Sequence, residues 1–303
     1  MLVGLRLRLA RLSAWEAFWF EPVPPHVYAL LRILFGFLGC VSLLTVADVS
    51  LYWNPQGLVS SGLPLVKAAL IRTNLGQPAG YALLSASLLT FVAVTLGYRT
   101  SVAVPLAFGV SILRVSWNSF PLSGANNVLQ LGLFYLIWTD CGGVWSIDAR
   151  RRRPSGPEHR TGPIAPLRLM RYQVALIYLS SGLWKLQNPF WQDGSALHFV
   201  LNQNLFARSP TGLPSWLDPL ATAGTYLTLF WELAFAPMVL YSRTRRLALY
   251  LGIVLHVGML LTLELGLFSY VMLASYVAFL DPHALARRVV RAHPPAVGTP
   301  ALR

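Results

Sequence analysis

The sequence is poor in charged residues and has almost no lysine. Charged residues make up 12% of the chain, whereas a soluble domain contains about 25%. Hydrophobic residues make up 55%, and the mean hydropathy is +0.55. This composition excludes an ordinary soluble domain and predicts an integral membrane protein.

Acidic residues are also scarce, with 11 Asp and Glu against 24 Lys and Arg. The net charge of +13 does not indicate a nucleic-acid partner, because the arginines lie between apolar segments. The tract from Arg150 to Arg153 is typical of the cytoplasmic side of a membrane protein, where it anchors the topology. We expect membrane lipids as partners, with anionic headgroups at this tract, and no nucleic acid.

Cysteine and the short motifs of common enzyme classes are nearly absent. Cys40 and Cys141 both lie in apolar segments and there is no Cys-x-x-Cys, so neither a disulfide framework nor a zinc site is indicated. The sequence has no His-x-x-x-His, Glu-x-x-His, P-loop or serine-hydrolase signature. We therefore expect no metal cofactor.

Eight segments are apolar enough to be predicted as membrane-spanning helices, since a span needs about 20 largely apolar residues. The fold is therefore predicted to be all-α and polytopic. Segments 57–75 and 192–209 are too mixed to span, and they are predicted to be re-entrant or interfacial. The eight predicted spans are 27–47, 79–97, 100–117, 124–145, 168–187, 219–241, 247–263 and 265–282.

The distribution of arginine predicts the orientation. Residues 1–24 are predicted to form an amphipathic helix on the membrane surface, because Arg6, Arg8 and Arg11 alternate with leucines ahead of several aromatic residues. With the N-terminus inside the cell, 18 of the 24 basic residues fall on the cytoplasmic side. We therefore expect a multi-pass protein of the cell membrane with both termini in the cytoplasm.

The chain is predicted to form one transmembrane domain over residues 25–290. A polar linker at 149–163, rich in Pro and Gly, divides this domain into halves of four spans each, 25–148 and 164–290. Residues 291–303 are expected to be a disordered tail.

Three ionisable residues inside predicted spans are the candidate catalytic residues, namely Lys185, Glu232 and His256. Charged groups are costly inside a membrane, so each one is a functional candidate. In the predicted topology Lys185 lies near the outer end of its span and the other two lie near mid-depth, around a cavity that opens outward. Further charged residues predicted near this cavity are Glu264, Arg32 and Arg114.

Lys185 is one of only two lysines, the other being Lys67. A lysine, unlike an arginine, can lose its proton when it is removed from water. Lys185 is therefore a candidate general base. The alternative is a lysine that extends to the membrane surface beside Trp184 and Trp191.

His256 also has two interpretations. It could pair with Glu232 and orient a proton acceptor or bind the polar head of a substrate. Alternatively, it could only hydrogen-bond to a neighbouring helix.

Two long stretches are distinctive, "RYQVALIYLSSGLWKLQNPFWQDG" at 171–194 and "LHVGMLLTLELGLFSYVMLASYVAFLDP" at 255–282. Two short ones are "VWSIDAR" at 144–150 and "LGYRT" at 96–100. All four resemble the HTTM domain family, the membrane domain related to vitamin K-dependent gamma-carboxylase. The resemblance extends from about residue 25 to residue 282.

The resemblance implies roles for the three candidate residues. Lys185 matches the second lysine of the carboxylase's Lys-Lys-Leu motif, which implies a general base that deprotonates a reduced quinone of the vitamin K or menaquinone type. His256 and Glu232 match a histidine and an acidic position of the family. The implied activity is quinol-dependent carboxylase-like chemistry, that of a lyase and oxygenase. The sequence departs from the motif at Trp184 and Gln187, where the carboxylase has Lys and Asp.

Two other functions stay open. Little sequence follows residue 282, where the carboxylase continues into a large extracytoplasmic region, so the chain is similar in length to short bacterial HTTM proteins. One of these matures a secreted sporulation-delaying toxin, which implies a maturation or export factor for an exported peptide, without carboxylase activity. The other hypothesis is a membrane carrier or lipid-binding protein.

Overall fold

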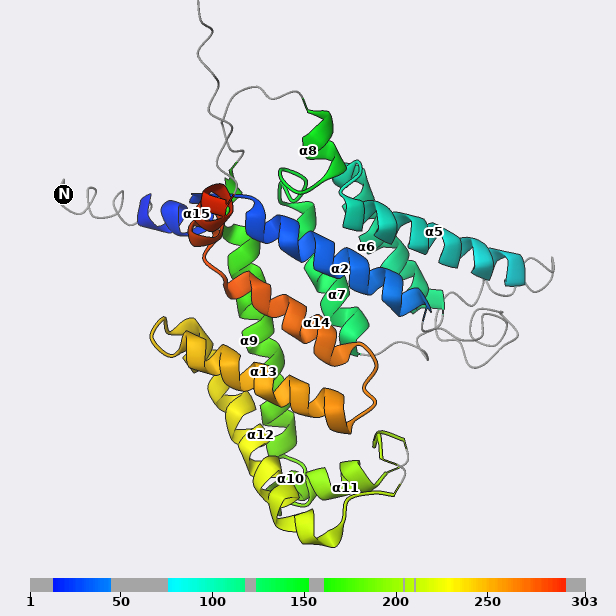
Figure 1. Cartoon of the computed structure of the whole chain (residues 1–303), viewed down its shortest axis with the longest axis vertical. Coiled ribbons are helices and arrows are strands. Elements are labelled where there is room, and N and C mark those ends of the chain that lie inside the picture. The colour runs from blue at the N-terminus through cyan, green and yellow to red at the C-terminus, as the bar shows by residue number, and fades with distance from the viewer. Residues whose placement is uncertain are drawn as a thin grey trace, which may run out of the picture.

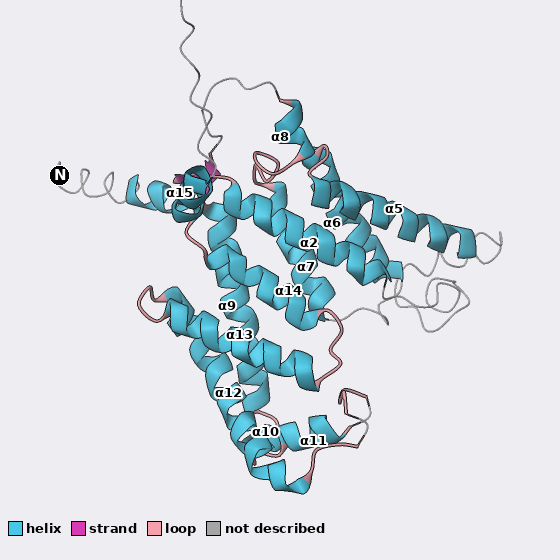
Figure 2. Cartoon of the chain, in the orientation of Figure 1, coloured by secondary structure: helices cyan, strands magenta, loops and turns pink. Residues whose placement is uncertain are grey.

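The computed structural model describes residues 13–44, 76–117, 124–152, 161–203, 205–209 and 211–292. Helices make up most of these residues (Figure 1). The strands within them are β1 and β2, of two residues each (Figure 2). The prediction of an all-α fold is therefore confirmed.

The first part of the chain contains one strand and five named helices. They are β1 (Pro22–Val23), α2 (His26–Leu44), α5 (Gly76–Leu96), α6 (Thr100–Trp117), α7 (Gly124–Ile137) and α8 (Ile147–Arg151). The second part begins with β2 (Gly162–Pro163) and contains α9 (Ala165–Leu186), α10 (Pro189–Gln192), α11 (Ala196–Asn202), the 3₁₀ turn η1 (Ser215–Leu217), α12 (Asp218–Leu240), α13 (Arg245–Thr262), α14 (Phe268–Ser275), the 3₁₀ turn η2 (Tyr276–Phe279) and α15 (Pro282–Ala292).

Each of the eight segments predicted to span the membrane contains a helix. Among the described residues, four helical stretches are long and apolar enough to cross a membrane, and they are His26–Leu44, Pro78–Leu96, Ser215–Leu240 and Arg245–Thr262. Thr100–Ser116 and Phe268–Phe279 are shorter apolar helices. The structure thus supports several spans, and the number eight stays a prediction.

Several other predictions are only partly covered by the described residues. Residues 13–20 are helical, but the three arginines of the predicted surface helix lie outside the described residues, so its amphipathic character stays a prediction. Segment 57–75 lies outside them as well. In segment 192–209, α11 has seven residues and is too short to span. The first two residues of the predicted tail, 291–303, belong to α15, which ends at Ala292, and the rest of the tail lies outside the described residues.

The predicted linker is structured at both ends. α8 covers its start, and β2 at its end pairs antiparallel with β1, with Pro22 opposite Pro163. The Tyr28 hydroxyl donates to the Pro163 carbonyl at 2.6 Å. These bonds hold the start of α9 beside the segment that enters α2.

The helices form two groups joined by α14 (Figure 1). α2 packs against α5 and α7, and α6 also packs against both α5 and α7. In the other group α12 packs against both α9 and α13. α14 and η2 contact α2, α7 and α9. The second half of the chain therefore packs into the first through α14 and η2, and also through direct contacts of α9 with α7 and of α15 with α2.

The apolar surface of the peripheral helices is mostly not buried inside the protein. In α12 and α13, Leu227, Phe230 and Leu261 are 64%, 68% and 71% exposed. Only 17% of the apolar window of α13 is buried, compared with 50% for α2. Soluble monomers rarely expose apolar patches of this extent. The surface is therefore suited to contact with lipid.

Arg32 of α2 is fully buried and holds the first group of helices together. Its Nη1 donates to the carbonyls of Val94 and Thr95 at 2.5 and 2.7 Å. Nε donates to the Cys141 carbonyl at 2.9 Å, and Nη2 to the Trp145 carbonyl at 2.6 Å. Carbonyls at the end of a helix have no partner within the helix. Arg32 therefore caps α5 and binds the loop after α7.

Asp148 of α8 stabilises the turn between α5 and α6. Gly97 and Arg99 in this turn have φ angles of 69° and 45°, in the left-handed region. The Asp148 carboxylate accepts the N–H groups of Arg99 and Thr100 at 2.7 and 2.8 Å, and the Thr100 hydroxyl at 2.9 Å. Burial acts to raise the pKa of Asp148, but these hydrogen bonds outweigh it and hold the pKa below its usual value.

Candidate functional site

Lys185 and Glu232 form an ion pair between α9 and α12. The Lys185 ammonium, in the last turn of α9, donates to Glu232 Oε1 and to Ser181 Oγ, the latter at 3.0 Å. The two helices approach closely here because Gly182 has no side chain; a Cβ at this position would lie 2.9 Å from a methyl carbon of Leu233. The structure thus brings together two of the three predicted site residues.

An aromatic ring lies against this ion pair. The Lys185 Nζ atom is 4.8 Å from the ring centroid of Trp191 in α10. Asn188 starts α10 by accepting the Phe190 N–H at 3.0 Å. The Tyr226 hydroxyl of α12 donates to the Gln192 carbonyl at 3.0 Å. These bonds hold the tryptophan at the end of α9, where a cation over an aromatic face is favourable.

The two charges are buried to different extents. The Lys185 side chain is 22% exposed and the Glu232 side chain is 9% exposed. Glu232 Oε2 is buried and has no hydrogen-bond partner among the described residues. A buried carboxylate oxygen without a partner costs free energy, of the order of 1–3 kcal/mol. This oxygen is therefore the unsatisfied atom of the site.

His256 does not pair with Glu232, in contrast to one of the two interpretations of the sequence. Its Nε2 lies 2.6 Å from the Tyr178 hydroxyl, and its Nδ1 lies 3.2 Å from the Ser269 hydroxyl. The Tyr178 hydroxyl also lies 2.8 Å from that of Tyr276. These side chains are almost completely buried and come from α9, α13, α14 and η2. The histidine therefore joins helices through hydrogen bonds, as the second interpretation predicts.

Aromatic packing surrounds Tyr178. Its ring centroid lies 4.6 Å from that of Trp231 and 4.3 Å from that of Phe235, both in α12. Trp231 donates its Nε1–H to the Ala248 carbonyl of α13 at 3.3 Å. Because Trp231 directly precedes Glu232, this packing also fixes the backbone that presents the carboxylate.

Two of the further charged residues predicted near the cavity lie in the other group of helices. Arg32 and Arg114 belong to α2 and α6, which pack mainly with α5 and α7. Within the part of the chain that the structure describes, the hydrogen bonds of Arg32 go to the carbonyls named above. The Glu264 side chain is exposed in the turn after α13, where its N–H donates to the Phe206 carbonyl at 2.8 Å. These positions do not support the expectation that Arg32, Arg114 and Glu264 surround Lys185.

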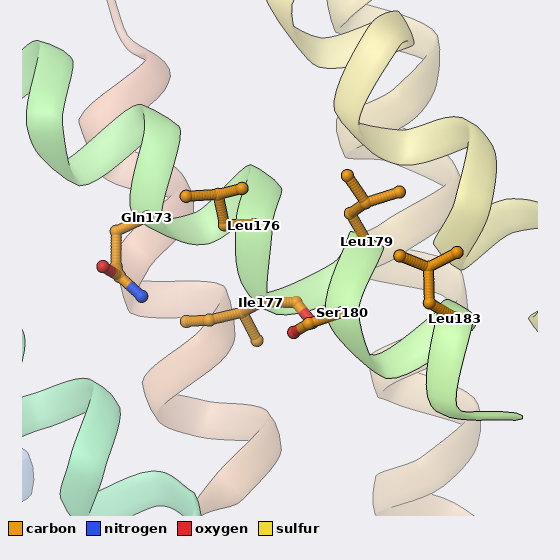
Figure 3. Close-up of a pocket in the computed structure, with 6 residues that line it drawn as sticks. All are labelled: Gln173, Leu176, Ile177, Leu179, Ser180 and Leu183. Atoms are coloured by element: carbon orange, nitrogen blue, oxygen red, sulfur yellow. The ribbon is translucent and has the colours of Figure 1, made fainter.

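A separate groove of about 250 Å³ lies along α9 (Figure 3). The close-up shows Leu176, Leu179 and Leu183 to one side and Ile177 to the other. Its lining residues are Gln173, Leu176, Ile177, Leu179, Ser180 and Leu183, all from α9 and none of them part of the ion pair. The groove is open and mainly apolar, so it is suited to a lipid chain more than to a polar reaction.

The helical spacing of Tyr178 relative to Lys185 is a sequence signal for its place beside the site. Tyr178, Ser181 and Lys185 are spaced by three and four residues, which places them on one face of a helix. Ser269 and Tyr276 offered no comparable pattern. Among the described residues, no group of three or more His, Cys, Asp or Glu side chains could hold a metal ion.

The HTTM domain family matches residues 20–283 of the chain. The sporulation-delaying protein SdpB of Bacillus subtilis (strain 168) is 28% identical over 124 residues, which are 38% of this chain and 37% of SdpB. The chain thus matches little more than a third of the length of this relative. No solved structure matches the chain.

Proposed function

This chain belongs to the HTTM domain family, and on that premise we propose that it is a multi-pass enzyme of the cell membrane whose proton-transfer site is the Lys185–Glu232 pair. The four long apolar helices and the two shorter ones, together with α7 and α9, would give eight spans. Arginines would then lie mainly in the cytoplasm together with both termini. The pair would lie near the outer side of the membrane, where the site opens.

The observation that supports this proposal most directly is the buried Glu232 Oε2 beside a paired lysine. A structural ion pair needs no vacant acceptor, whereas a site that receives a proton from a ligand does. The ammonium of Lys185 compensates the negative charge of Glu232, so the carboxylate can stay ionised in a poorly hydrated environment. A donor hydroxyl that approaches past the exposed part of Lys185 meets both charges.

The residues around the pair fit a reduced quinone. Trp191 offers an aromatic face to a ring, Glu232 Oε2 offers an acceptor to a phenolic hydroxyl, and Lys185 offers a positive charge to the oxygen that loses its proton. When bound, a reduced quinone would supply the electrons that carboxylase-like chemistry with oxygen requires. No metal is part of this proposal.

His256 would act as a positioning residue. It bonds Tyr178, which is seven residues before Lys185 on the same face of α9. Its role would be to fix the rotation of α9 and thereby the direction of the lysine toward α12.

The test uses the purified protein in lipid nanodiscs with reduced menaquinone. We expect the wild type to bind it and to accelerate its oxidation in air. Replacing both charges together, Lys185→Met with Glu232→Met, should weaken binding about tenfold or more, since hydrogen bonds to charged groups contribute about 1.5–3 kcal/mol. The double variant leaves no unpaired buried charge, so it is expected to fold. Absence of binding by the folded wild type would overturn the proposal.

The similarity to SdpB supports a second candidate function. In this alternative the chain is a maturation or export factor for an exported peptide and has no carboxylase activity. Mass spectrometry of peptides exported by cells with and without the gene tests it. A peptide whose processing depends on the gene, and persists in the Lys185→Met/Glu232→Met variant, would favour this alternative; an unchanged peptide profile would contradict it.

A further inference from the structure

We infer that Glu232, through Oε2, accepts the hydrogen bond and then the proton of the ligand, and that Lys185 is the charged partner that positions it. This inference rests on the proposed function and assigns its two residues different roles. It differs from the role that the resemblance implies, in which the lysine itself is the base.

The hydrogen bonds of Lys185 leave no open acceptor on its nitrogen. An ammonium group has three N–H donors and no lone pair. One donor reaches Glu232 Oε1 and one reaches Ser181 Oγ. Nζ also lies against the Trp191 ring, 4.8 Å from its centroid. In this geometry Lys185 presents positive charge to a ligand and cannot receive a proton.

Transfer of a proton within the pair does not change this conclusion. If Lys185 gave a proton to Glu232, the vacated lone pair would point along the broken bond, toward Glu232 Oε1. A ligand would have to displace the carboxyl group to reach it. The neighbouring Ser181 Oγ already accepts the lysine N–H, and both ring nitrogens of His256 lie within hydrogen-bond distance of hydroxyl groups.

Glu232 Oε2 is the atom with a free acceptor position. It is buried, lacks a partner among the described residues and belongs to a side chain that is 9% exposed. In the inferred step, the O–H bond of the ligand breaks, its proton bonds to Oε2, and the electron pair stays on the ligand oxygen. The resulting negative charge on the ligand oxygen lies beside the Lys185 ammonium. The positive charge of Lys185 then stabilises the ligand oxygen in place of the carboxylate, which is now neutral.

The first measurement concerns the protein without ligand. With only two lysines in the sequence, acylation of Lys185 by an amine-selective reagent at neutral pH can be followed by peptide mass spectrometry. We expect Lys185 to react slowly in the wild type and about tenfold or more faster in Glu232→Gln, because the substitution removes the carboxylate that accepts the Lys185 N–H. Equally fast acylation in the wild type would show a free lone pair on Lys185 and would overturn the inference.

The second measurement is an infrared difference spectrum on addition of reduced menaquinone. We expect the signal of a newly protonated carboxyl group in the wild type and in Lys185→Arg, which keeps the positive charge and cannot act as a base. The signal should be lost in Glu232→Gln. Binding by Lys185→Arg without this signal, or persistence of the signal in Glu232→Gln, would refute the assignment.

The two measurements separate the inference from the proposed function. If the wild type does not bind reduced menaquinone, the proposed function fails, and the acylation rates still decide whether Lys185 can act as a base. A thermal unfolding scan of Glu232→Gln checks that it is folded. If it is not, Lys185→Met/Glu232→Met replaces it in the infrared experiment, at a concentration of reduced menaquinone that saturates its weaker binding.

Discussion

The Tyr178 hydroxyl lies 2.6 Å from Nε2 of His256, and this hydrogen bond joins α9 to α13. Two turns further along the same face of α9, Lys185 forms its ion pair with Glu232 of α12. The face therefore has a neutral hydrogen-bonded layer and a charged layer. The neutral layer is the more deeply buried, so it fixes the helices between which the charged layer lies.

Tyr178→Phe should destabilise the protein while leaving Lys185 and Glu232 in place. The substitution removes the hydroxyl that bonds both His256 and Tyr276, and it leaves buried polar groups without a partner. We expect a loss of about 1–3 kcal/mol, measured as a lower unfolding temperature in detergent. Tyr172→Phe, on a partly exposed tyrosine of the same helix, is the control. Equal unfolding temperatures for the two variants would show that the network contributes nothing to stability.

Hydrophobic patterning predicted where the apolar helices lie, whereas the number of them that cross a membrane stays a prediction. The predicted segment 27–47 and α2, His26–Leu44, nearly coincide. α9 contains 22 residues, yet Arg168, Arg171 and Lys185 interrupt its apolar surface. A helix with three basic residues is stable in a membrane only where other helices supply partners for these charges. The sequence does not show which helices those are. Length and composition therefore support four spans directly.

The candidate site was predictable in its residue types and not in its pairing. Ionisable residues in apolar segments identified Lys185, Glu232 and His256 because charge is costly there. Whether Glu232 meets the lysine or the histidine depends on the relative rotation of α9, α12 and α13. That rotation follows from contacts such as Gly182 with Leu233, which connect positions far apart in the sequence.

Arg32→Lys should be strongly destabilising although it keeps the charge. The planar guanidinium of Arg32 donates to four carbonyls in different directions, and a single ammonium has three donors. We expect a loss of about 2–4 kcal/mol from the unsatisfied buried carbonyls, seen as reduced yield of folded protein and a lower unfolding temperature. Arg208→Lys, on an exposed arginine, should be close to wild type. Wild-type stability of Arg32→Lys would show that its charge alone is sufficient.

Asp148 should contribute stability at neutral pH that is lost in acid. Its pKa is lower in the folded protein than in the unfolded chain, so its contribution is present above the unfolded pKa of about 3.9 and disappears as the pH falls through the folded value. We expect Asp148→Asn to be less stable by about 1 kcal/mol at pH 7 and to approach the wild type below pH ~4. Unfolding temperatures across this range test the difference. A gap between the two proteins that does not change with pH would contradict the role assigned to the charge.

Gly252→Ala should disrupt the hydrogen-bonded layer by steric contact alone. A Cβ at Gly252 would lie 2.1 Å from the Tyr276 hydroxyl and 2.7 Å from a ring carbon of Trp231, both of which are held by the packing around Tyr178. Overpacking of this kind costs about 1–3 kcal/mol. Gly258→Ala is the matched control, because it lies on the same helix and its Cβ would meet nothing within 4 Å. Since alanine favours a helix over glycine by about 1 kcal/mol, Gly258→Ala should be neutral or stabilising. Opposite shifts in unfolding temperature for the two alanines would locate the tight packing at Gly252, and similar shifts would mean that helix propensity, not contact with Tyr276, decides the result.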